Sequence, residues 1–281
     1  MSSCEISHIS AGYGKKNILD QVSFSLEPGM ILGILGANGS GKTTLLKSIC
    51  GILPHSGSCL LDGVCLEKLS ARKKALMCSY IPQRSGISID ISVLDVVVMG
   101  FNPQLKLLEP PTPAMRQRAL EALKLAGLSG KEHANYLHLS EGQKQLCILA
   151  RTLVSDARLL LLDEPESALD LQFRYRMLHT LSSWVKSQNS CAVLSLHDPN
   201  LALRYCDRLL LLLQGRVLGI LSPAKMQPDD MKPFFEKLYG KISLQRCPLS
   251  CSDALVLLKE EEDLPDFFDS AKQNDTRGTA L

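Results

Sequence analysis

Short apolar runs recur along the chain, and a glycine-rich segment separates the first clear strand from the first clear helix. Residues 30–35 read Met-Ile-Leu-Gly-Ile-Leu, a pattern typical of a strand buried on both faces. Residues 44–50 carry apolar side chains at helical spacing. The pattern therefore predicts a strand, a tight glycine-rich turn and then a helix.

Farther along, strand-like and helix-like segments alternate. We expect strands at 158–162, 192–196 and 208–213, and a helix at 172–187 between the first two. This alternation is typical of a parallel sheet covered by helices. The predicted fold class is α/β, with a parallel sheet at its centre.

The N-terminal region predicts a second layer, of antiparallel strands. Segments 4–9, 22–26, 58–61 and 65–66 have strand patterns, and the turn Asp62-Gly63 joins the last two. We therefore expect an antiparallel β subdomain flanking the glycine-rich turn.

A third region, from about residue 92 to 150, has helical spacing. A proline-rich loop at 110–113 interrupts it. Because strand patterns flank this region on both sides, it is predicted to be a helical subdomain inserted into the α/β core.

The chain changes character after Pro223. A short helix near 231–239 and strands at 242–246 and 254–258 are expected there. We therefore divide the chain into a main domain over 3–222, an extension over 223–264 and a tail over 265–281. The tail is polar and is expected to be disordered.

Composition narrows the function classes. Hydrophobic residues make up 45% of the chain, charged residues 21%, and the formal net charge is +2. This balance is ordinary for a soluble protein and does not favour nucleic acid as a partner. Apolar runs such as 209–213 are far shorter than the roughly 20 residues that cross a bilayer. The N-terminus shows no signal-peptide pattern, so we expect a cytoplasmic location.

The ten cysteines do not predict a disulfide framework. Half of them lie within apolar patterns, as expected of buried thiols in a reducing compartment. Cys247 and Cys251 have a spacing that a metal site could use, but no histidine pair lies near them. We therefore interpret the cysteines mainly as small core residues.

The segment from Gly36 to Thr43 reads Gly-Ala-Asn-Gly-Ser-Gly-Lys-Thr, which predicts a phosphate-binding loop between strand and helix. Glycines let backbone N–H groups converge on phosphate oxygens, and the start of the helix adds a positive dipole. Lys42 would neutralise the β- and γ-phosphates, and the Thr43 hydroxyl would bind Mg²⁺. The predicted nucleotide-binding residues here are Gly36, Asn38, Gly39, Ser40, Gly41, Lys42, Thr43 and Thr44.

Two acids end the apolar strand at 159–162. Asp163 is a candidate Mg²⁺ ligand, and Glu164 is a candidate general base for an attacking water. His197 follows the next strand, and parallel order brings it to the same edge of the sheet. These residues predict a hydrolytic site for a nucleoside triphosphate.

Taken with Leu139-Ser-Glu-Gly-Gln143, these motifs resemble the ATP-binding subunit of an ABC transporter over about residues 4–221. The resemblance implies a P-loop NTPase core and a homodimer with two ATP molecules between the subunits. Ser140, Gly142 and Gln143 match the signature that contacts the partner's ATP, and Asp170 matches the loop at the dimer interface. Gln83 matches a glutamine that reaches Mg²⁺, and Tyr13 matches the aromatic that stacks on adenine.

The sequence departs from the family pattern at two positions. Glu141 stands where the signature usually has glycine, and Glu166 stands where serine or threonine commonly follows Asp-Glu-Pro. Neither change removes a phosphate-contacting group, so we expect them to affect the rate and not the reaction. The Glu141 side chain is expected to point away from the nucleotide.

Partners and substrate follow only from the resemblance. With no membrane-spanning segment, the chain is expected to act on separate permease subunits at the cytoplasmic face of the membrane, and indirectly with a substrate-binding protein. Residues 92–100 and 197–202 resemble the subgroup that imports iron–siderophore, haem and cobalamin complexes.

Three alternatives remain open at this point. The stretch 81–85 is also similar to zinc and manganese importers. Soluble ABC ATPases of DNA repair or translation are a second possibility, although this chain has neither a long coiled coil nor a tandem domain. A small P-loop kinase is the third, but it would lack the signature at 139–143.

Overall fold

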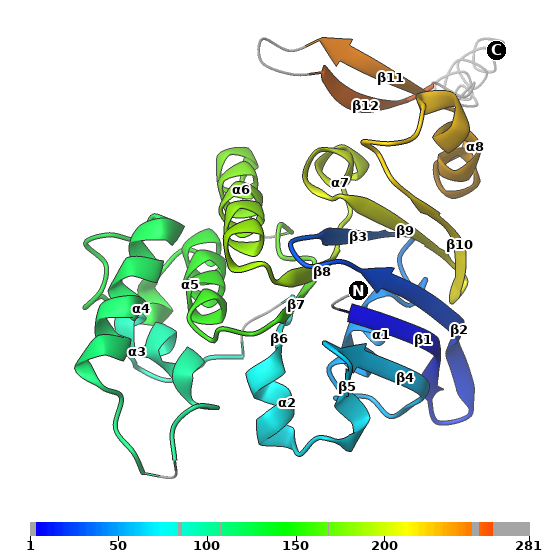
Figure 1. Ribbon diagram of the computed structural model, residues 1–281. Helices are drawn as coiled ribbons and strands as arrows, with labels where there is room; N and C mark the ends of the chain where they lie inside the picture. The colour runs from blue at the N-terminus through cyan, green and yellow to red at the C-terminus, as the bar shows by residue number, and fades with distance from the viewer. Residues whose placement is uncertain (1–3, 84–85, 107, 168, 249–252, 261–281) are drawn as a thin grey trace, which may run out of the picture.

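The computed structural model describes residues 4–83, 86–106, 108–167, 169–248 and 253–260, and it forms three sheets with helices around them (Figure 1). The largest sheet has six strands in the order β10-β9-β3-β8-β7-β6. Its neighbours pair in parallel except β9 and β10, which are antiparallel. The strand bounds are β3 Ile31–Leu35, β6 Cys78–Ile81, β7 Leu159–Asp163, β8 Cys191–Ser195, β9 Arg208–Leu213 and β10 Arg216–Leu221.

The central strands are buried on both faces, as their continuous apolar runs predict. Side chains alternate between two cores because successive residues of a strand point to opposite faces. Leu160 and Leu162 pack in one core, whereas Leu159 and Leu161 pack in the other. The predicted strands 158–162, 192–196 and 208–213 are confirmed to within one residue at each end.

One core lies between the six-stranded sheet and an antiparallel sheet of order β2-β1-β4-β5. Helix α1 (Lys42–Ile49) contacts β1 and β2 on one side and β7 and β8 on the other, so it fills the space between the sheets. The antiparallel strands are β1 Cys4–Tyr13, β2 Lys16–Leu26, β4 His55–Leu61 and β5 Val64–Cys65.

The four predicted antiparallel strands were right in position, but three were too short and the fourth was shifted by one residue. β1 and β2 continue to a tight turn at 14–15, because the hairpin pairing extends through mixed polar and apolar residues that include the buried Ala11 and Leu19. Leu66 was predicted to be in a strand, but it opens the short 3-10 helix η1 (Leu66–Lys68). Its side chain is nonetheless buried, which explains the apolar signal.

The other core packs helices against the opposite face of the six-stranded sheet. The segment predicted to be helical holds α3 Val93–Val98, η2 Met99–Phe101, α4 Pro113–Ala126, η3 Tyr136–His138 and α5 Glu141–Leu153. Helices α3, α4 and α5 lie together at one side of the molecule in Figure 1. Two further helices, α6 Leu171–Gln188 and α7 Pro199–Tyr205, follow β7 and β8.

The region after Pro223 forms α8 (Pro228–Tyr239) and a hairpin of β11 (Ile242–Pro248) and β12 (Asp253–Lys259). This confirms the predicted helix and both strands there. The hairpin projects from the end of the molecule opposite α2 in Figure 1. The tail at 265–281 and Cys251 lie outside the described residues, and the division of the chain into domains stays a prediction.

Four helices and strands were missing from the sequence interpretation: α2 (Ala71–Met77), β6, β10 and α7. Helix α2 has no buried residue, so it lacks the apolar stripe that identifies a helix. Strand β6 reads Cys-Ser-Tyr-Ile, which is too short and too polar for a clear pattern.

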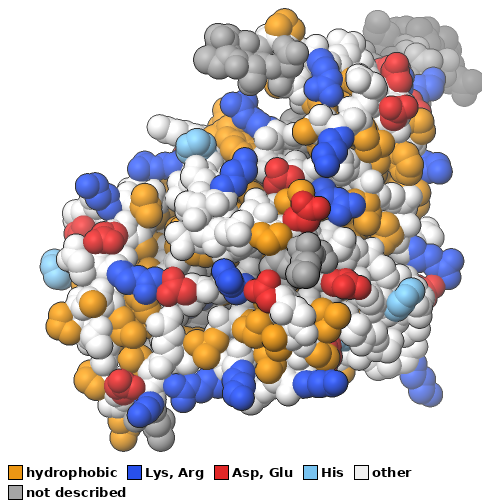
Figure 2. All heavy atoms as spheres, viewed as in Figure 1, with side chains coloured by type: hydrophobic (Ala, Val, Ile, Leu, Met, Phe, Trp, Pro, Cys, Tyr) orange, Lys and Arg blue, Asp and Glu red, His pale blue; other side chains and the backbone are white. Residues whose placement is uncertain are grey.

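The surface carries charges of both signs. On the face shown in Figure 2, Lys and Arg side chains are interspersed with Asp and Glu. None of the described helices is both long and apolar enough to span a bilayer.

Candidate active site

The glycine-rich segment forms the turn between β3 and α1. Gly39 and Gly41 have φ angles of 79° and 108°, in the left-handed region that favours glycine. A Cβ atom on Gly36 would lie 2.4 Å from the carbonyl oxygen of Leu212 on β9. A side chain at Gly36 is therefore excluded by close approach of the backbone.

A cavity of about 200 Å³ opens beside this turn. It brings together most of the residues predicted to hold the nucleotide and Glu164, which directly follows β7. The lining residues are Tyr13, Ile18, Asn38, Gly39, Gly41, Lys42, Thr43, Thr44 and Glu164. Tyr13 is half exposed at the edge, so its ring is free to stack on a planar group.

Two groups of the turn indicate that it is built for an anion. The Lys42 side chain is buried, and its Nζ donates to the Gly36 carbonyl at 2.9 Å. Burial lowers the pKa of Lys42, while Glu164, Asp163 and Glu166 oppose that shift. The Ser40 hydroxyl is buried without a hydrogen-bond partner among the described residues. Phosphate oxygens would supply acceptors for both groups.

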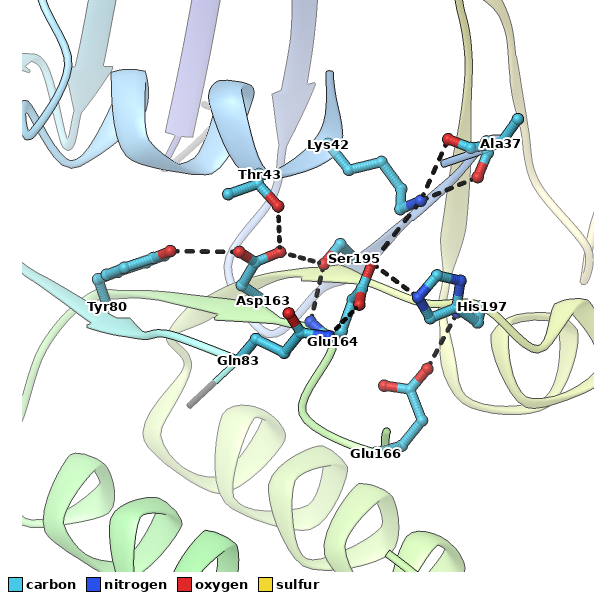
Figure 3. A network of polar contacts seen from close by, with 11 residues as sticks. Ala37, Lys42, Thr43, Tyr80, Gln83, Asp163, Glu164, Glu166, Ser195 and His197 are labelled. Carbon is cyan, nitrogen blue, oxygen red and sulfur yellow. Dashed lines mark hydrogen bonds and ion pairs between the residues drawn. The ribbon is translucent and has the colours of Figure 1, made fainter. Parts of the chain in front are cut away.

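Asp163 is the centre of a hydrogen-bond network that joins three strands and α1 (Figure 3). Its Oδ1 accepts from Thr43 Oγ1 at 3.0 Å and from Ser195 Oγ at 2.8 Å. Its Oδ2 accepts from Tyr80 at 3.3 Å. A hydroxyl and a carboxylate held together beside a phosphate-binding turn are the oxygen ligands that Mg²⁺ prefers, so these residues fit that ion.

Glu164 faces the cavity and is held from three directions (Figure 3). Its Oε1 lies 2.7 Å from His197 Nε2 and 3.8 Å from Lys42 Nζ. Its Oε2 accepts from Gln83 Nε2 at 2.7 Å. The structure therefore brings together Glu164, His197 and Gln83, the three residues predicted to act in hydrolysis.

The backbone of Glu164 is strained. Its φ is 46°, in the left-handed region, which costs a residue other than glycine on the order of 1–3 kcal/mol. The backbone N–H of Glu164 donates to Ser195 Oγ at 2.8 Å, which helps to hold this conformation. Residues with a strained backbone are often found at active sites.

Glu166 supports His197 from behind. Its Oε1 accepts from the backbone N–H of His197 at 3.0 Å, while its Oε2 is buried without a partner among the described residues. Burial raises the pKa of this carboxyl, although the hydrogen bond from His197 lowers it in part. Glu166, one of the two departures from the family pattern, thus holds the backbone at His197, just beyond the end of β8.

The raised pKa predicts a pH-dependent effect of Glu166→Gln. Folding favours the neutral carboxyl, so the native protein loses stability as pH rises through the raised pKa. Glutamine keeps the acceptor for His197 but carries no charge. The variant should therefore unfold at higher urea than the wild type at pH 8, and the gain should shrink toward pH 4.5, the ordinary value. An equal gain at both pH values would contradict this explanation.

The signature residues lie at the start of α5. Ser140 and Gln143 form a capping box, in which the Ser140 hydroxyl accepts from Gln143 N and the Gln143 side chain accepts from Ser140 N. Glu141 is largely exposed and pairs with Lys144 at 2.7 Å on its own helix. Asp170 caps α6 by accepting from Phe173 N.

None of the signature residues lines the cavity beside the glycine-rich turn of the same chain. The structure instead packs them near the loop before α6, since a Cβ on Gly142 would lie 3.2 Å from Leu169. Ser140, Gly142, Gln143 and Asp170 are thus grouped apart from Lys42 and Glu164.

The sequence interpretation missed four residues of this site, of which Ile18 lines the cavity. Tyr80 and Ser195 bind Asp163, and Gln145 donates to the Gln83 carbonyl at 2.8 Å. Ser195 lies next to the end of the predicted strand 192–196, two residues before His197, so its position could have been inferred. Tyr80 and Gln145 carried no comparable signal, because their roles depend on which strands and helices become neighbours.

Comparisons with known proteins agree with this geometry. A family model described as ABC transporter matches residues 19–167. The Hemin import ATP-binding protein HmuV of Bordetella avium is 38% identical over 261 residues, covering 89% of this chain and 97% of that protein. The Probable iron chelatin transport ATP-binding protein of Helicobacter pylori is 33% identical, covering 83% and 92%.

A solved structure described as an inward-facing conformation of a putative metal-chelate type ABC transporter aligns with a TM-score of 0.77. It is 27% identical and covers 92% of this chain and 99% of that chain. The family match and these relatives show that the chain belongs to the family of ABC transporter ATP-binding domains.

Proposed function

We propose that this chain hydrolyses ATP to power a membrane importer of haem or iron chelates. The observation that carries the proposal is the cluster of Glu164, His197, Gln83 and Lys42 around the phosphate-binding cavity. The names of the relatives favour iron compounds as the transported class.

Some residues in and around the cavity would bind ATP and Mg²⁺, and others would transfer the proton during hydrolysis. Lys42, Ser40 and the turn's N–H groups would bind the phosphates, and the Tyr13 ring would stack on the base. Glu164 would accept the proton of the attacking water, with His197 and Gln83 fixing its carboxylate. Thr43 and Asp163, with Gln83 beside them, would hold Mg²⁺, which when bound would neutralise charge on the phosphate oxygens.

A second copy of the chain would complete each site. Ser140, Gly142 and Gln143 lie apart from the cavity of their own chain, so they are available to a partner's nucleotide. The capping box occupies the N–H groups of Ser140 and Gln143. The N–H groups of Glu141 and Gly142, at the positive end of the helix dipole, would receive the anion. We infer a homodimer with two shared ATP molecules.

This arrangement predicts a small effect of Glu141→Gly. The exposed Glu141 carboxylate pairs with Lys144 and stabilises the start of α5 by ~0.3–1 kcal/mol. ATP-dependent dimerisation should therefore shift less than tenfold, which sedimentation against ATP concentration can measure. A strong gain in ATP affinity for the variant, largest at low salt, would show that Glu141 faces the partner's phosphate.

Coupling to a permease would pass through Gln83. Its side chain reaches Glu164, while its carbonyl accepts from Gln145 on α5, so one residue joins the hydrolytic site to the helical segment. We expect the permease to dock on this helical segment, near residues 86–99.

The bond from Gln145 predicts a coupling defect. Gln145→Leu keeps the side chain's size but removes the donor to Gln83. ATP hydrolysis by the free subunit should fall less than the stimulation of hydrolysis by transport substrate in a permease complex. Gln117→Leu, at an exposed position of α4, is the matched control. Equal loss in both assays would mean that the bond serves stability alone.

The experiment that tests the proposed function is reconstitution with the membrane protein that copurifies with the chain. ATP-dependent uptake of haem, a ferric siderophore, cobalamin, Zn²⁺ and Mn²⁺ into vesicles is compared. The proposal expects uptake of haem or the ferric siderophore, lost in Glu164→Gln. Uptake of Zn²⁺ or Mn²⁺ alone would support the alternative importer class, and the absence of any permease partner would support a non-transport ATPase.

A further inference from the structure

We propose that His55, Cys59, Cys65 and Glu67 form a binding site for zinc or a chemically similar soft divalent cation. The four residues lie within thirteen positions of the chain, on β4, β5 and η1 of the antiparallel sheet. The site is separate from the phosphate-binding cavity, whose lining includes none of them.

Three of the candidate ligand atoms, from His55, Cys59 and Glu67, lie within 4.8 Å of one another, and the Cys65 thiol lies beside them on the second oxygen of Glu67. His55 Nε2 lies 3.1 Å from Glu67 Oε1 and 3.9 Å from Cys59 Sγ. Cys65 Sγ lies 3.0 Å from Glu67 Oε2. In a tetrahedral zinc site, ordinary bond lengths place nitrogen and sulfur ligands about 3.6 Å apart and nitrogen and oxygen ligands about 3.4 Å apart. Small side-chain shifts of these three residues would therefore make room for the ion, and rotation of the Cys65 side chain would bring its thiol in as the fourth ligand.

The histidine is oriented as a metal ligand. Its Nδ1 lies 3.3 Å from the carbonyl oxygen of Leu53, which can only accept, so Nδ1 carries the proton. In a neutral ring, Nε2 then presents a lone pair toward the Glu67 carboxylate, which also presents lone pairs. A cation between them removes this repulsion. A backbone carbonyl on the far ring nitrogen is the usual support of a zinc-bound histidine.

Burial and charge also suit a soft cation. Cys59 is fully buried and the His55 side chain nearly so, whereas Cys65 and Glu67 are partly exposed and give the ion a path inward. Glu67 offers two carboxylate oxygens, of which Oε1 faces His55 and Oε2 faces Cys65. Binding would release both thiol protons to solvent and leave a pair of thiolates, an imidazole and a carboxylate around the ion.

The consequence is a clamp on the β4–β5 hairpin. The ion would tie His55 at the start of β4 to Glu67 in η1, and so close the hairpin with its following turn. His55 pairs with Ala11 on β1, two residues before Tyr13 at the nucleotide cavity. A bound ion would stabilise the folded chain by linkage.

The test measures binding of Zn²⁺ and Co²⁺ to the full chain in excess Mg²⁺, which competes for the phosphate site. The proposal expects one tight equivalent, a thiolate-to-cobalt absorption band, release of protons and a higher unfolding temperature with Zn²⁺. Cys65→Ser and His55→Ala should each weaken Zn²⁺ binding at least tenfold. Cys247→Ser, a cysteine of β11 far along the chain, should bind as the wild type does.

Cys65→Ser is also assayed for ATP hydrolysis, which should be unchanged, because Cys65 is outside the nucleotide cavity. Failure of the proposed ATPase function would leave the Zn²⁺ measurement unaffected. No thiolate band, or equal binding by wild type and Cys65→Ser, would show that these residues only hydrogen-bond to one another and would overturn the proposal. Loss of binding only in Cys247→Ser would place the ion elsewhere and overturn it as well.

Discussion

Replacing Glu164 with glutamine is expected to abolish nearly all ATP hydrolysis while leaving ATP binding intact. Glutamine keeps the size of the side chain and can still contact His197 and Gln83, but it cannot accept a proton from water. General-base catalysis typically contributes ~10²–10⁴-fold, so the turnover rate should fall by that factor. Phosphate release by the purified chain and by its permease complex measures the loss.

The matched control is Glu121→Gln, an exposed acid on α4 far from the cavity lining. It should hydrolyse ATP at the wild-type rate. If Glu164→Gln retains wild-type turnover in the permease complex, Glu164 is not the base, and His197 becomes the group to test.

The second large effect is expected for Lys42→Ala, in ATP binding. The Lys42 ammonium is buried in the turn and faces both the Gly36 carbonyl and Glu164, so its loss leaves the phosphates opposite an unscreened acid. A hydrogen bond to a charged group contributes about 1.5–3 kcal/mol, which corresponds to roughly 10- to 100-fold in affinity. Titration with a fluorescent ATP analogue measures the change.

Lys47→Ala serves as the control because Lys47 lies on the same helix, in its last turn, and is outside the cavity lining. It should bind ATP within about twofold of the wild type. Equal affinity for Lys42→Ala and the wild type would mean that the turn's backbone N–H groups alone hold the phosphates.

The elements around the phosphate-binding turn could be predicted from sequence because their signals are local. Met30 to Leu35 is an apolar run. The glycines that follow it are required by positive φ angles and by close backbone contacts in the structure. Strand β7 could likewise be predicted from the four leucines before Asp163. Helix α2 gave no such signal, since it buries no side chain.

The support of the hydrolytic site could not be predicted in the same way. Asp163 is held by Tyr80 from β6 and Ser195 from β8, and both contacts exist because β7 lies between those two strands. Strand order is a property of the whole sheet, and the spacing of a single motif does not predict it. The cluster around Glu67 was missed for a related reason, because a short hairpin and a 3-10 turn bring its members together.

The claim that a second copy of the chain completes each ATP site is tested most directly by the mass of Glu164→Gln in solution with and without ATP. The account predicts a monomer without nucleotide and a dimer holding two ATP molecules when Mg²⁺ and ATP are present. Adding Ser140→Arg to the same chain should prevent the dimer, because the larger cation replaces the cap at the start of α5. A chain that binds ATP fully yet stays a monomer would contradict the account.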